Sequence, residues 1–295
     1  MLNAFTADVE DYYQVHNFEH QVDRCDWERF ESRILRNTRR VLDLLDRHGV
    51  RGTFFVLTWN AEREPELVRE IHRAGHEVAS HGRSHRLVYE QQPAEFAADI
   101  TAARATLEAL TGEPVIGYRA PSYSITAESR WALERIRAAG YLYDSSVYPI
   151  RRRRYGLPEA PRHPHAVGEL VEFPLPTLRV AGLNLPAASG AYLRLLPLAI
   201  STAAVAQLNR AGHPAAVNVH PWELDPGQPR LTGGRFGGLT HYANLDRTEA
   251  RLDALLRRFR FGTMRESLAA AGFALGATAP PLAAPPAAAR AARAR

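Results

Sequence analysis

The sequence predicts an α/β fold in which parallel strands form a barrel rather than an open sheet. Apolar strand-like segments alternate with amphipathic helical segments, which is the pattern of βαβ units. About seven segments have the length and composition of strands. Asp8, His81, Arg119 and His220 each come at or directly after the end of such a segment. Functional side chains gather at the C-terminal ends of strands in barrels, so these four residues are expected to meet.

The first half of the chain carries the clearest element signals. In segment 29–48, apolar residues recur at helical spacing and Gly49 follows where a C-cap belongs. Segment 65–74 has Pro65 near its first turn and Gly75 after its last. The predicted strands cover residues 2–9, 50–57, 77–80 and 115–118. The predicted helices cover residues 29–48, residues 65–74, a segment that opens at Pro93 and a segment from Thr126 to Gly140.

The second half continues the alternation and ends in a tail of low complexity. Strands are predicted at 170–173 and 215–219, and helices at 198–211 and 247–259. We find no linker or internal repeat before residue 276, so residues 1–275 are predicted to form one domain. Residues 276–295 are rich in Ala, Pro and Arg, and such a composition predicts a disordered tail.

The basic residues limit the chemistry and the partners. All 37 are arginines, which excludes Schiff-base catalysis and a P-loop lysine. The net charge is +5, and Arg290, Arg293 and Arg295 in the tail account for three of those charges, which leaves +2 for the body. We therefore expect no nucleic-acid partner. The basic run 151–154 predicts a solvated loop or a contact with an anionic partner or surface.

Cysteine content and apolar runs bear on location. Cys25 is the single cysteine, so an internal disulfide and a cysteine-based zinc site are both excluded. The N-terminus has no basic and apolar leader, and no segment approaches the ~20 apolar residues of a membrane span. These features predict a cytoplasmic protein without a transmembrane segment, with peripheral membrane association left open.

Two histidines four residues apart, His81 and His85, predict a metal site. On a helix such a pair shares one face, so both rings can hold one ion. Asp8, Glu10 and Asp11 follow the first strand and offer a carboxylate ligand and a base. In an extended strand Asp8 and Glu10 share a face, whereas a turn after Asp8 would bring Asp11 inward instead. Three protein ligands leave coordination positions open for water and substrate, as in catalytic sites.

Further residues complete a hydrolytic set. His220 ends the strand 215–219 and can donate a proton near neutral pH, and Glu223 and Asp225 follow closely enough to raise its pKa. Arg119 can hold the base carboxylate ionised and fixed in orientation. Four aromatic residues are candidates for the walls of a sugar site: Trp59, Tyr123, Trp222 and Tyr242.

In this order the motifs resemble those of the polysaccharide deacetylases of carbohydrate esterase family 4, the NodB homology group. The motifs are Asp8-Val-Glu-Asp11, His81-Gly-Arg-Ser-His85, Arg119-Ala-Pro121, Tyr143-Asp144-Ser-Ser-Val-Tyr148 and Val217-Asn-Val-His220. The chain further resembles the exosortase-associated (PEP-CTERM) subgroup of exopolysaccharide gene clusters. The stretches that carry this second resemblance are 8–15, 118–125, 220–223 and 241–245.

The resemblance implies a distorted, incomplete (β/α)7-type barrel, with a subgroup-specific C-terminal part from about residue 147. It implies a divalent metal, with zinc expected before cobalt, nickel or iron. In this family Asp8 would be the base, His220 the acid, and His81 and His85 metal ligands, with Arg119 in the catalytic set. Substrate-binding positions would be Pro121, Tyr123, Asp144 and Trp222.

Two departures from the family pattern bear on these roles. The usual acidic motif has adjacent aspartates, but here Val9 intervenes, so the third ligand is Glu10 or Asp11. We favour Glu10 because it shares the strand face of Asp8. The late motif usually has leucine two residues before its histidine, whereas this chain has Asn218.

The function predicted is metal-dependent hydrolytic N-deacetylation of N-acetylhexosamine units in an exopolysaccharide or its lipid-linked precursor. The expected partner is an N-acetylated polysaccharide or oligosaccharide. Two alternatives remain: a related hydrolase of a linear or cyclic non-sugar amide, such as a ureide, and a non-catalytic glycan-binding protein.

Overall fold

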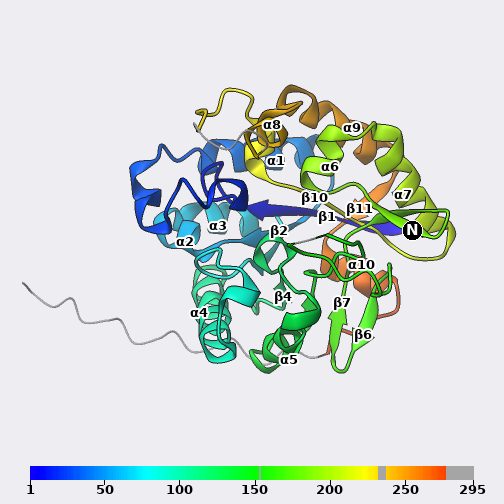
Figure 1. Ribbon diagram of the computed structural model, residues 1–295, viewed down its shortest axis with the longest axis horizontal. Coiled ribbons are helices and arrows are strands. Elements are labelled where there is room, and N and C mark those ends of the chain that lie inside the picture. Colours follow the sequence, from blue (N-terminus) through cyan, green and yellow to red (C-terminus); the bar gives the residue numbers. More distant parts are fainter. Residues whose placement is uncertain (153, 232–236, 277–295) are drawn as a thin grey trace, which may run out of the picture.

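The computed structural model describes residues 1–152, 154–231 and 237–276. Figure 1 shows strands in the interior of the molecule, with helices packed around them. All but the first residue of the predicted disordered tail, 276–295, lies outside the described residues. Among the described helices, none combines the length and apolar character that crossing a bilayer requires.

A curled, mostly parallel sheet forms the centre of the fold. Seven strands run side by side and parallel, in the order β10 (Ala216–Val219), β1 (Leu2–Val9), β2 (Thr53–Val56), β3 (Glu77–Ser80), β4 (Gly117–Tyr118), β5 (Tyr143–Asp144) and β7 (Leu170–Glu172). Beyond β7, β6 (His165–Val167) pairs antiparallel, and β11 (Arg260–Gly262) pairs with the first residues of β1. Among the described strands no pairing joins β6 to β10, so the predicted barrel is confirmed as incomplete.

Helices cover the outer face of this sheet. The described helices are α1 (Ile34–Arg47), α2 (Thr58–Arg63), α3 (Pro65–Arg73), α4 (Pro93–Thr111), α5 (Trp131–Ala138), α6 (Gly190–Leu195), α7 (Leu198–Arg210), α8 (Gly237–Tyr242), α9 (Thr248–Arg258) and α10 (Met264–Ala270). The main core packs Phe5 and Val9 of β1 against these helices. The alternate residues of β1 face the inside of the sheet, because side chains of a strand alternate between its faces. This alternation places Asp8 and Glu10 in the interior, at the C-terminal end of β1.

Several predicted boundaries differ from the structure. The helix predicted at 29–48 begins only at Ile34, after a 3-10 helix at Arg24–Arg29. The strand predicted at 50–57 shortens to β2, since Gly52 and the residues before it form the turn from α1. Sequence patterns did not predict α2, α10, or the β8 (Thr177–Val180) and β9 (Leu183–Pro186) hairpin, all of which are short elements.

Candidate active site

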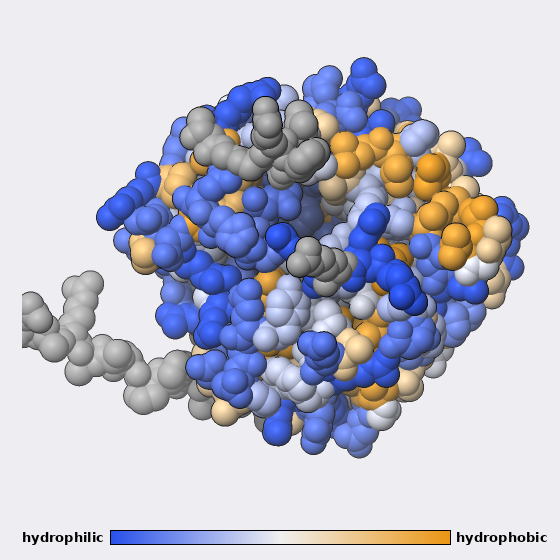
Figure 2. All heavy atoms as spheres, in the orientation of Figure 1, coloured by the Kyte–Doolittle hydropathy of each residue, from blue (hydrophilic) through white to orange (hydrophobic). Residues whose placement is uncertain are grey.

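The predicted base, acid and metal ligands meet in one cleft at the C-terminal ends of β1, β3 and β10, whereas Arg119 is buried behind Asp8. Asp8, Glu10, His81, His85 and His220 all line it. Figure 2 shows a hollow on this face of the molecule. The topology explains the convergence, because carboxyl ends of neighbouring parallel strands lie at the same edge of a sheet.

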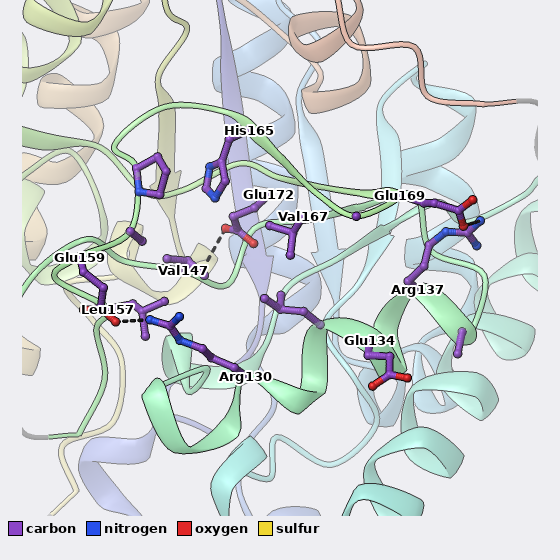
Figure 3. A pocket seen from close by; sticks show the side chains of 15 residues that line it. Arg130, Glu134, Arg137, Val147, Leu157, Glu159, His165, Val167, Glu169 and Glu172 are labelled. Atoms are coloured by element: carbon purple, nitrogen blue, oxygen red, sulfur yellow. Dashed lines mark hydrogen bonds and ion pairs between the residues drawn. The ribbon is translucent and has the colours of Figure 1, made fainter.

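A second cleft, about 780 Å³ in volume, lies elsewhere, between α5 and the β6–β7 hairpin. Its charged residues are largely paired, as Figure 3 shows for Arg130 with Glu159 and for Arg137 beside Glu169. Glu172 also lines it and accepts a hydrogen bond from the Val147 amide at 3.0 Å. None of the residues predicted from the sequence as catalytic or metal-binding lines this larger cleft.

Glu10, His81 and His85 form a group suited to one metal ion. Each offers a ligand atom, these atoms lie within 4.8 Å of one another, and all three residues are buried. The His81 Nδ1–H donates to the Arg119 carbonyl at 2.8 Å, which fixes the ring and leaves Nε2 for a ligand role. Glu10 Oε2 lies 2.8 Å from His85 Nε2, yet it accepts no well-formed hydrogen bond from the described residues. A buried carboxylate oxygen without a hydrogen bond is available to bind a cation.

The two histidines lie in a loop after β3. The sequence analysis paired them on the basis of helical spacing, and that geometry was wrong. His81 follows β3 directly, and the chain then turns through Gly82 at φ +73° and His85 at φ +53°. The Gly82 carbonyl accepts a hydrogen bond from the Thr58 amide at 3.0 Å, which ties the loop to the start of α2. The ring centroids of His81 and His85 end 5.4 Å apart.

Asp8 is held by two side chains from other strands. Arg119, which is fully buried, donates from Nη1 to Asp8 Oδ1 at 2.7 Å. The Asn218 amide donates to Asp8 Oδ2 at 2.9 Å and to the Tyr123 hydroxyl at 2.7 Å. Burial alone would raise the pKa of Asp8, but the charges of Arg119, His81 and His220 outweigh it and lower this pKa to about 2. Asp8 is therefore a fixed, ionised carboxylate.

Asn218 belongs to this polar network rather than to an apolar floor. Its Oδ1 accepts hydrogen bonds from Arg119 Nη1 and from the Thr6 hydroxyl, both at 2.7 Å. Because this chain has Asn218 where the family usually has leucine, an amide side chain here contacts both Asp8, the candidate base, and Arg119.

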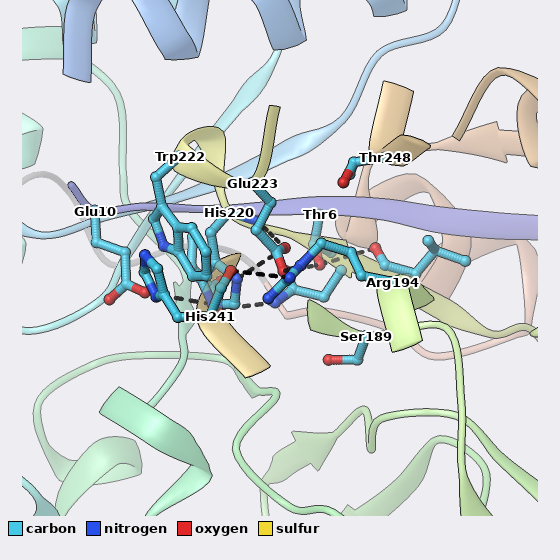
Figure 4. Close-up of polar contacts among 12 residues, drawn as sticks. Thr6, Glu10, Ser189, Arg194, His220, Trp222, Glu223, His241 and Thr248 are labelled. Atoms are coloured by element: carbon cyan, nitrogen blue, oxygen red, sulfur yellow. Dashed lines mark hydrogen bonds and ion pairs between the residues drawn. The ribbon is translucent and has the colours of Figure 1, made fainter. Parts of the chain in front are cut away.

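His220 faces the same centre from β10, and a carboxylate orients it from behind. Its Nε2 lies 3.4 Å from Glu10 Oε1 and 3.6 Å from Asp8 Oδ2, while Nδ1 lies 3.1 Å from Glu223 Oε2. Figure 4 shows the continuation, in which Arg194 Nε donates to Glu223 Oε1 at 2.6 Å. Burial would lower the pKa of His220, but Glu10 and Glu223 outweigh it and raise this pKa to about 9.

Arg194 is a buried residue that sequence reasoning missed. Its Nη1 donates to the backbone carbonyls of His241 and Ala243, at 3.0 and 2.6 Å. No motif marks this arginine, and only the fold brings α6 beside Glu223. Asp225, which we expected beside His220, instead accepts from Arg33 and Arg36.

The acidic alternative, Asp11, points away from the metal-binding group. Its carboxylate accepts from the Arg33 amide at 2.7 Å and from the Ser32 hydroxyl at 3.1 Å, so it organises the approach to α1. Burial raises the pKa of Asp11 to about 6. The geometry therefore favours Glu10 as the third ligand.

The substrate-binding predictions divide into two groups. Tyr123 and Trp222 line the cleft, together with Tyr148, Tyr155 and Tyr192, which sequence reasoning missed. Pro121 and Asp144 are not among the residues that line it, and their substrate-binding role stays a prediction. Asp144 accepts a hydrogen bond from the Ser146 hydroxyl at 2.6 Å, and burial raises its pKa beside the Glu172 carboxyl. Trp222 stacks between the rings of His220 and His241, whereas Trp59 and Tyr242 are outside the lining.

Family models match two adjoining parts of the chain. Residues 27–141 match the family "Polysaccharide deacetylase", and residues 145–269 match a domain of unknown function, DUF3473. The predicted division at about residue 147, within one domain of residues 1–275, stays a prediction.

Curated relatives resemble the first of these parts. A peptidoglycan-N-acetylglucosamine deacetylase from Bacillus cereus is 32% identical over 99 residues, which are 33% of this chain and 36% of the relative. A chitooligosaccharide deacetylase from a Bradyrhizobium species is 42% identical over 69 residues, which are 23% of this chain and 32% of the relative. The chain thus matches about a third of the length of these relatives.

Solved structures support the fold. PuuE allantoinase aligns with a TM-score of 0.59 at 16% identity, covering 92% of this chain and 89% of its own. A crystal structure from Mycobacterium smegmatis, assigned to the polysaccharide deacetylases, aligns with a TM-score of 0.56 at 22% identity, covering 90% and 87%. Sequence and fold agree: residues 27–141 match the polysaccharide deacetylase family, and the chain has the fold of these solved structures.

Proposed function

We propose that this protein is a metal-dependent hydrolase that removes the acetyl group from N-acetylhexosamine units of a glycan. One observation carries the proposal: Asp8 and His220 face the centre that Glu10, His81 and His85 surround. Amide hydrolysis needs a group that takes a proton from water and another that gives one to the leaving amine. The cleft offers both beside a prospective metal site, with His220 Nε2 3.6 Å from Asp8 Oδ2.

Two imidazoles and one carboxylate fit a divalent ion with open coordination positions, with zinc first and cobalt, nickel or iron as further choices. Glu10, His81 and His85 would hold it, because the Glu10 oxygen lacks a hydrogen bond and His81 is already oriented by Arg119. When bound, such an ion supplies a Lewis acid that polarises a carbonyl and acidifies water.

Asp8 has the features of the proton acceptor. Arg119 and Asn218 each occupy one of its oxygens, which fixes the carboxylate plane. A carboxylate oxygen accepts more than one hydrogen bond, so Oδ2 keeps capacity toward the cleft. The low pKa of Asp8 keeps it ionised and ready to accept a proton at neutral pH.

His220 has the features of the proton donor. Its pKa of about 9 keeps the ring protonated at neutral pH, and Nε2 points toward the cleft. Glu223 holds Nδ1, and Arg194 holds Glu223, so the ring keeps its orientation while it donates. A leaving amine at Nε2 would receive this proton.

The cleft walls support a sugar substrate. Tyr123, Tyr148, Tyr155 and Tyr192 line the cleft, and flat aromatic faces pack well against the apolar face of a sugar ring, whereas both faces of Trp222 are covered by His220 and His241. The names of the relatives refer to N-acetylglucosamine and chitooligosaccharide. The finer choices stay proposals: an exopolysaccharide or its lipid-linked precursor as substrate, the exosortase-associated subgroup, and a cytoplasmic location.

The direct test compares His81→Ala with His20→Ala, whose ring is 82% exposed and does not line this cleft. The wild type and His20→Ala should release acetate from N-acetylglucosamine oligomers and retain a divalent metal. His81→Ala should lose both, because it removes a ligand. Full turnover by His81→Ala would contradict the proposal, and hydrolysis of a cyclic ureide without acetate release would favour the amide-hydrolase alternative. Oligomer binding without any turnover would favour a glycan-binding protein.

A further inference from the structure

The β8–β9 hairpin presents an apolar face to solvent. In its register Val180 pairs with Leu183, and Leu178 pairs with Leu185. Paired residues and those two positions away share one face of a hairpin, so these four side chains lie together. Val180, Leu183 and Leu185 are 48%, 68% and 39% exposed. Few large apolar residues of the described chain are exposed to this degree, and three of them are on this one hairpin.

The polar face of the same hairpin turns toward the protein. Thr177 accepts a hydrogen bond from Arg162 at 2.8 Å, and Asn184 donates to the Pro149 carbonyl at 2.7 Å. A hairpin packed for stability alone would bury its leucines and expose its threonine and asparagine. The reversed orientation leaves the leucines without a partner among the described residues, as at a binding surface.

Arginines without acidic partners lie next to this hairpin. The Pro149 carbonyl that Asn184 contacts comes two residues before Arg151, and Arg151, Arg152 and Arg154 are all exposed. No ion pair joins these three arginines to a carboxylate of the described residues. Among the described residues, most other exposed arginines form an ion pair with an Asp or Glu, whereas this segment carries uncompensated positive charge.

The arginines also adjoin the active-site cleft. Arg152 Nε donates to the Tyr192 hydroxyl at 3.1 Å, and Tyr192 lines the cleft. Leu195, on the same helix α6, is 39% exposed. In Figure 2, strongly hydrophilic residues lie beside the hollow. A hydrophobic patch lies toward the right, over the segment that is yellow-green in Figure 1. One face of the molecule thus combines the cleft mouth, positive charge and exposed leucines.

We propose that this face docks on an anionic lipid bilayer, with Leu183 and its hairpin neighbours inserted among the lipids and Arg151, Arg152 and Arg154 on lipid phosphates. A surface that is both basic and apolar matches the boundary between lipid headgroups and acyl chains. An acidic glycan would satisfy the arginines but leave Leu183 in water. A second copy packed on this face around a two-fold axis would bring the arginine runs together.

Docking in this way would turn the cleft mouth toward the bilayer. A glycan attached to a lipid carrier would then present its first sugars to the cleft while its lipid stays in the membrane. This consequence rests on the proposed deacetylase function, whereas docking itself does not. Vesicle binding and acetate release therefore test the two proposals separately.

The experiment is vesicle flotation of the full chain with phosphatidylcholine alone and with added phosphatidylglycerol. We expect binding only to the anionic vesicles, and release at high salt, because exposed charges are screened. Each arginine near an anionic surface contributes about fivefold in affinity, so R151A/R152A/R154A should bind about 100-fold more weakly. Leu183→Ser with Leu185→Ser should also abolish flotation, because it removes the inserted apolar surface.

Matched controls use the same residue types elsewhere. Val167→Ser alters an apolar residue that is 36% exposed on the β6–β7 hairpin, and Arg135→Ala removes an exposed arginine from α5. Both should float like the wild type, and every variant should keep the wild-type unfolding midpoint. Failure of the wild type to float with anionic vesicles overturns the proposal. So does flotation unaffected by both sets of changes, or concentration-dependent dimerisation that Leu183→Ser abolishes while vesicle binding is absent.

Discussion

The chain up to residue 144 and the chain after it contribute differently to one cleft. The first part contributes the proposed metal ligands Glu10, His81 and His85, and the proposed base Asp8 with its partner Arg119. The second part contributes His220 and the residues that orient it, most of the aromatic wall, and the apolar hairpin. This difference teaches that strand ends of the first part position the proposed metal and base residues, whereas the second part forms most of the wall around them.

The largest effect is expected in the first part. Asp8→Asn keeps the shape of the side chain but removes the base, so kcat for acetate release should fall by about 10³-fold or more. Metal content should stay at the wild-type value, because Asp8 is not among the grouped ligands. Elemental analysis and steady-state kinetics on the same sample check both statements.

Asp11→Asn is the matched control for this substitution. Asp11 lies in the same motif but contacts Ser32 and the Arg33 amide, so turnover should remain near the wild-type value. An Asp11→Asn variant as inactive as Asp8→Asn would show that the cleft is organised differently from this account.

A smaller effect is expected in the second part. Glu223→Gln removes the negative charge behind His220 but retains an oxygen that can accept from Nδ1. A charge-assisted hydrogen bond contributes about 1.5–3 kcal/mol, so kcat should fall about 10- to 100-fold with little change in KM. Glu249→Gln, which alters an ion-paired glutamate on α9, serves as the control and should leave kcat unchanged.

The smallest effect is expected at the boundary between the two parts. There, Asp144 of β5 lies opposite Glu172 of β7 in the register of the parallel strands. Burial raises the pKa of both carboxyls, and the Asp144 charge raises the pKa of Glu172 further, whereas the hydrogen bond with Glu172 partly lowers the pKa of Asp144. A carboxyl with a raised folded-state pKa favours folding while it stays protonated. Stability is therefore lost as pH rises above the unfolded pKa toward the folded one.

Glu172→Gln removes this titration, so its unfolding midpoint should fall less than that of the wild type as pH is raised. A relative gain of about 2–4 °C near neutral pH is expected for a stabilisation of about 1 kcal/mol. Thermal unfolding followed by circular dichroism across the pH range measures it. Parallel pH profiles for the two proteins would refute the role given to this pair.

The sequence predicted the first part of the molecule better than the second. Strand 2–9 and strand 77–80 agree with β1 and β3 residue for residue, because long apolar or well-bounded segments leave few alternatives. Glu10 was favoured over Asp11 by strand alternation, and the structure agrees with that geometry. The catalytic motifs were recognisable because each lies within a few consecutive residues.

What the sequence could not predict depends on contacts between distant segments. The link from Arg194 to Glu223 joins residues 29 positions apart without any local pattern. Asp144 was expected in the substrate cleft, yet its strand directs it toward Glu172. The inverted β8–β9 hairpin has the ordinary alternation of a strand, and alternation alone does not say which face is buried.

The central claim is that one divalent cation binds Glu10, His81 and His85 together. Anomalous diffraction at the absorption edge of the metal, from crystals of the protein soaked with zinc, tests it most directly. We predict a single strong peak at bonding distance from the two imidazole nitrogens and a Glu10 oxygen, with the Asp11 carboxylate still on Ser32 and Arg33. A peak elsewhere, or no peak at these three side chains at saturating zinc, would contradict the account.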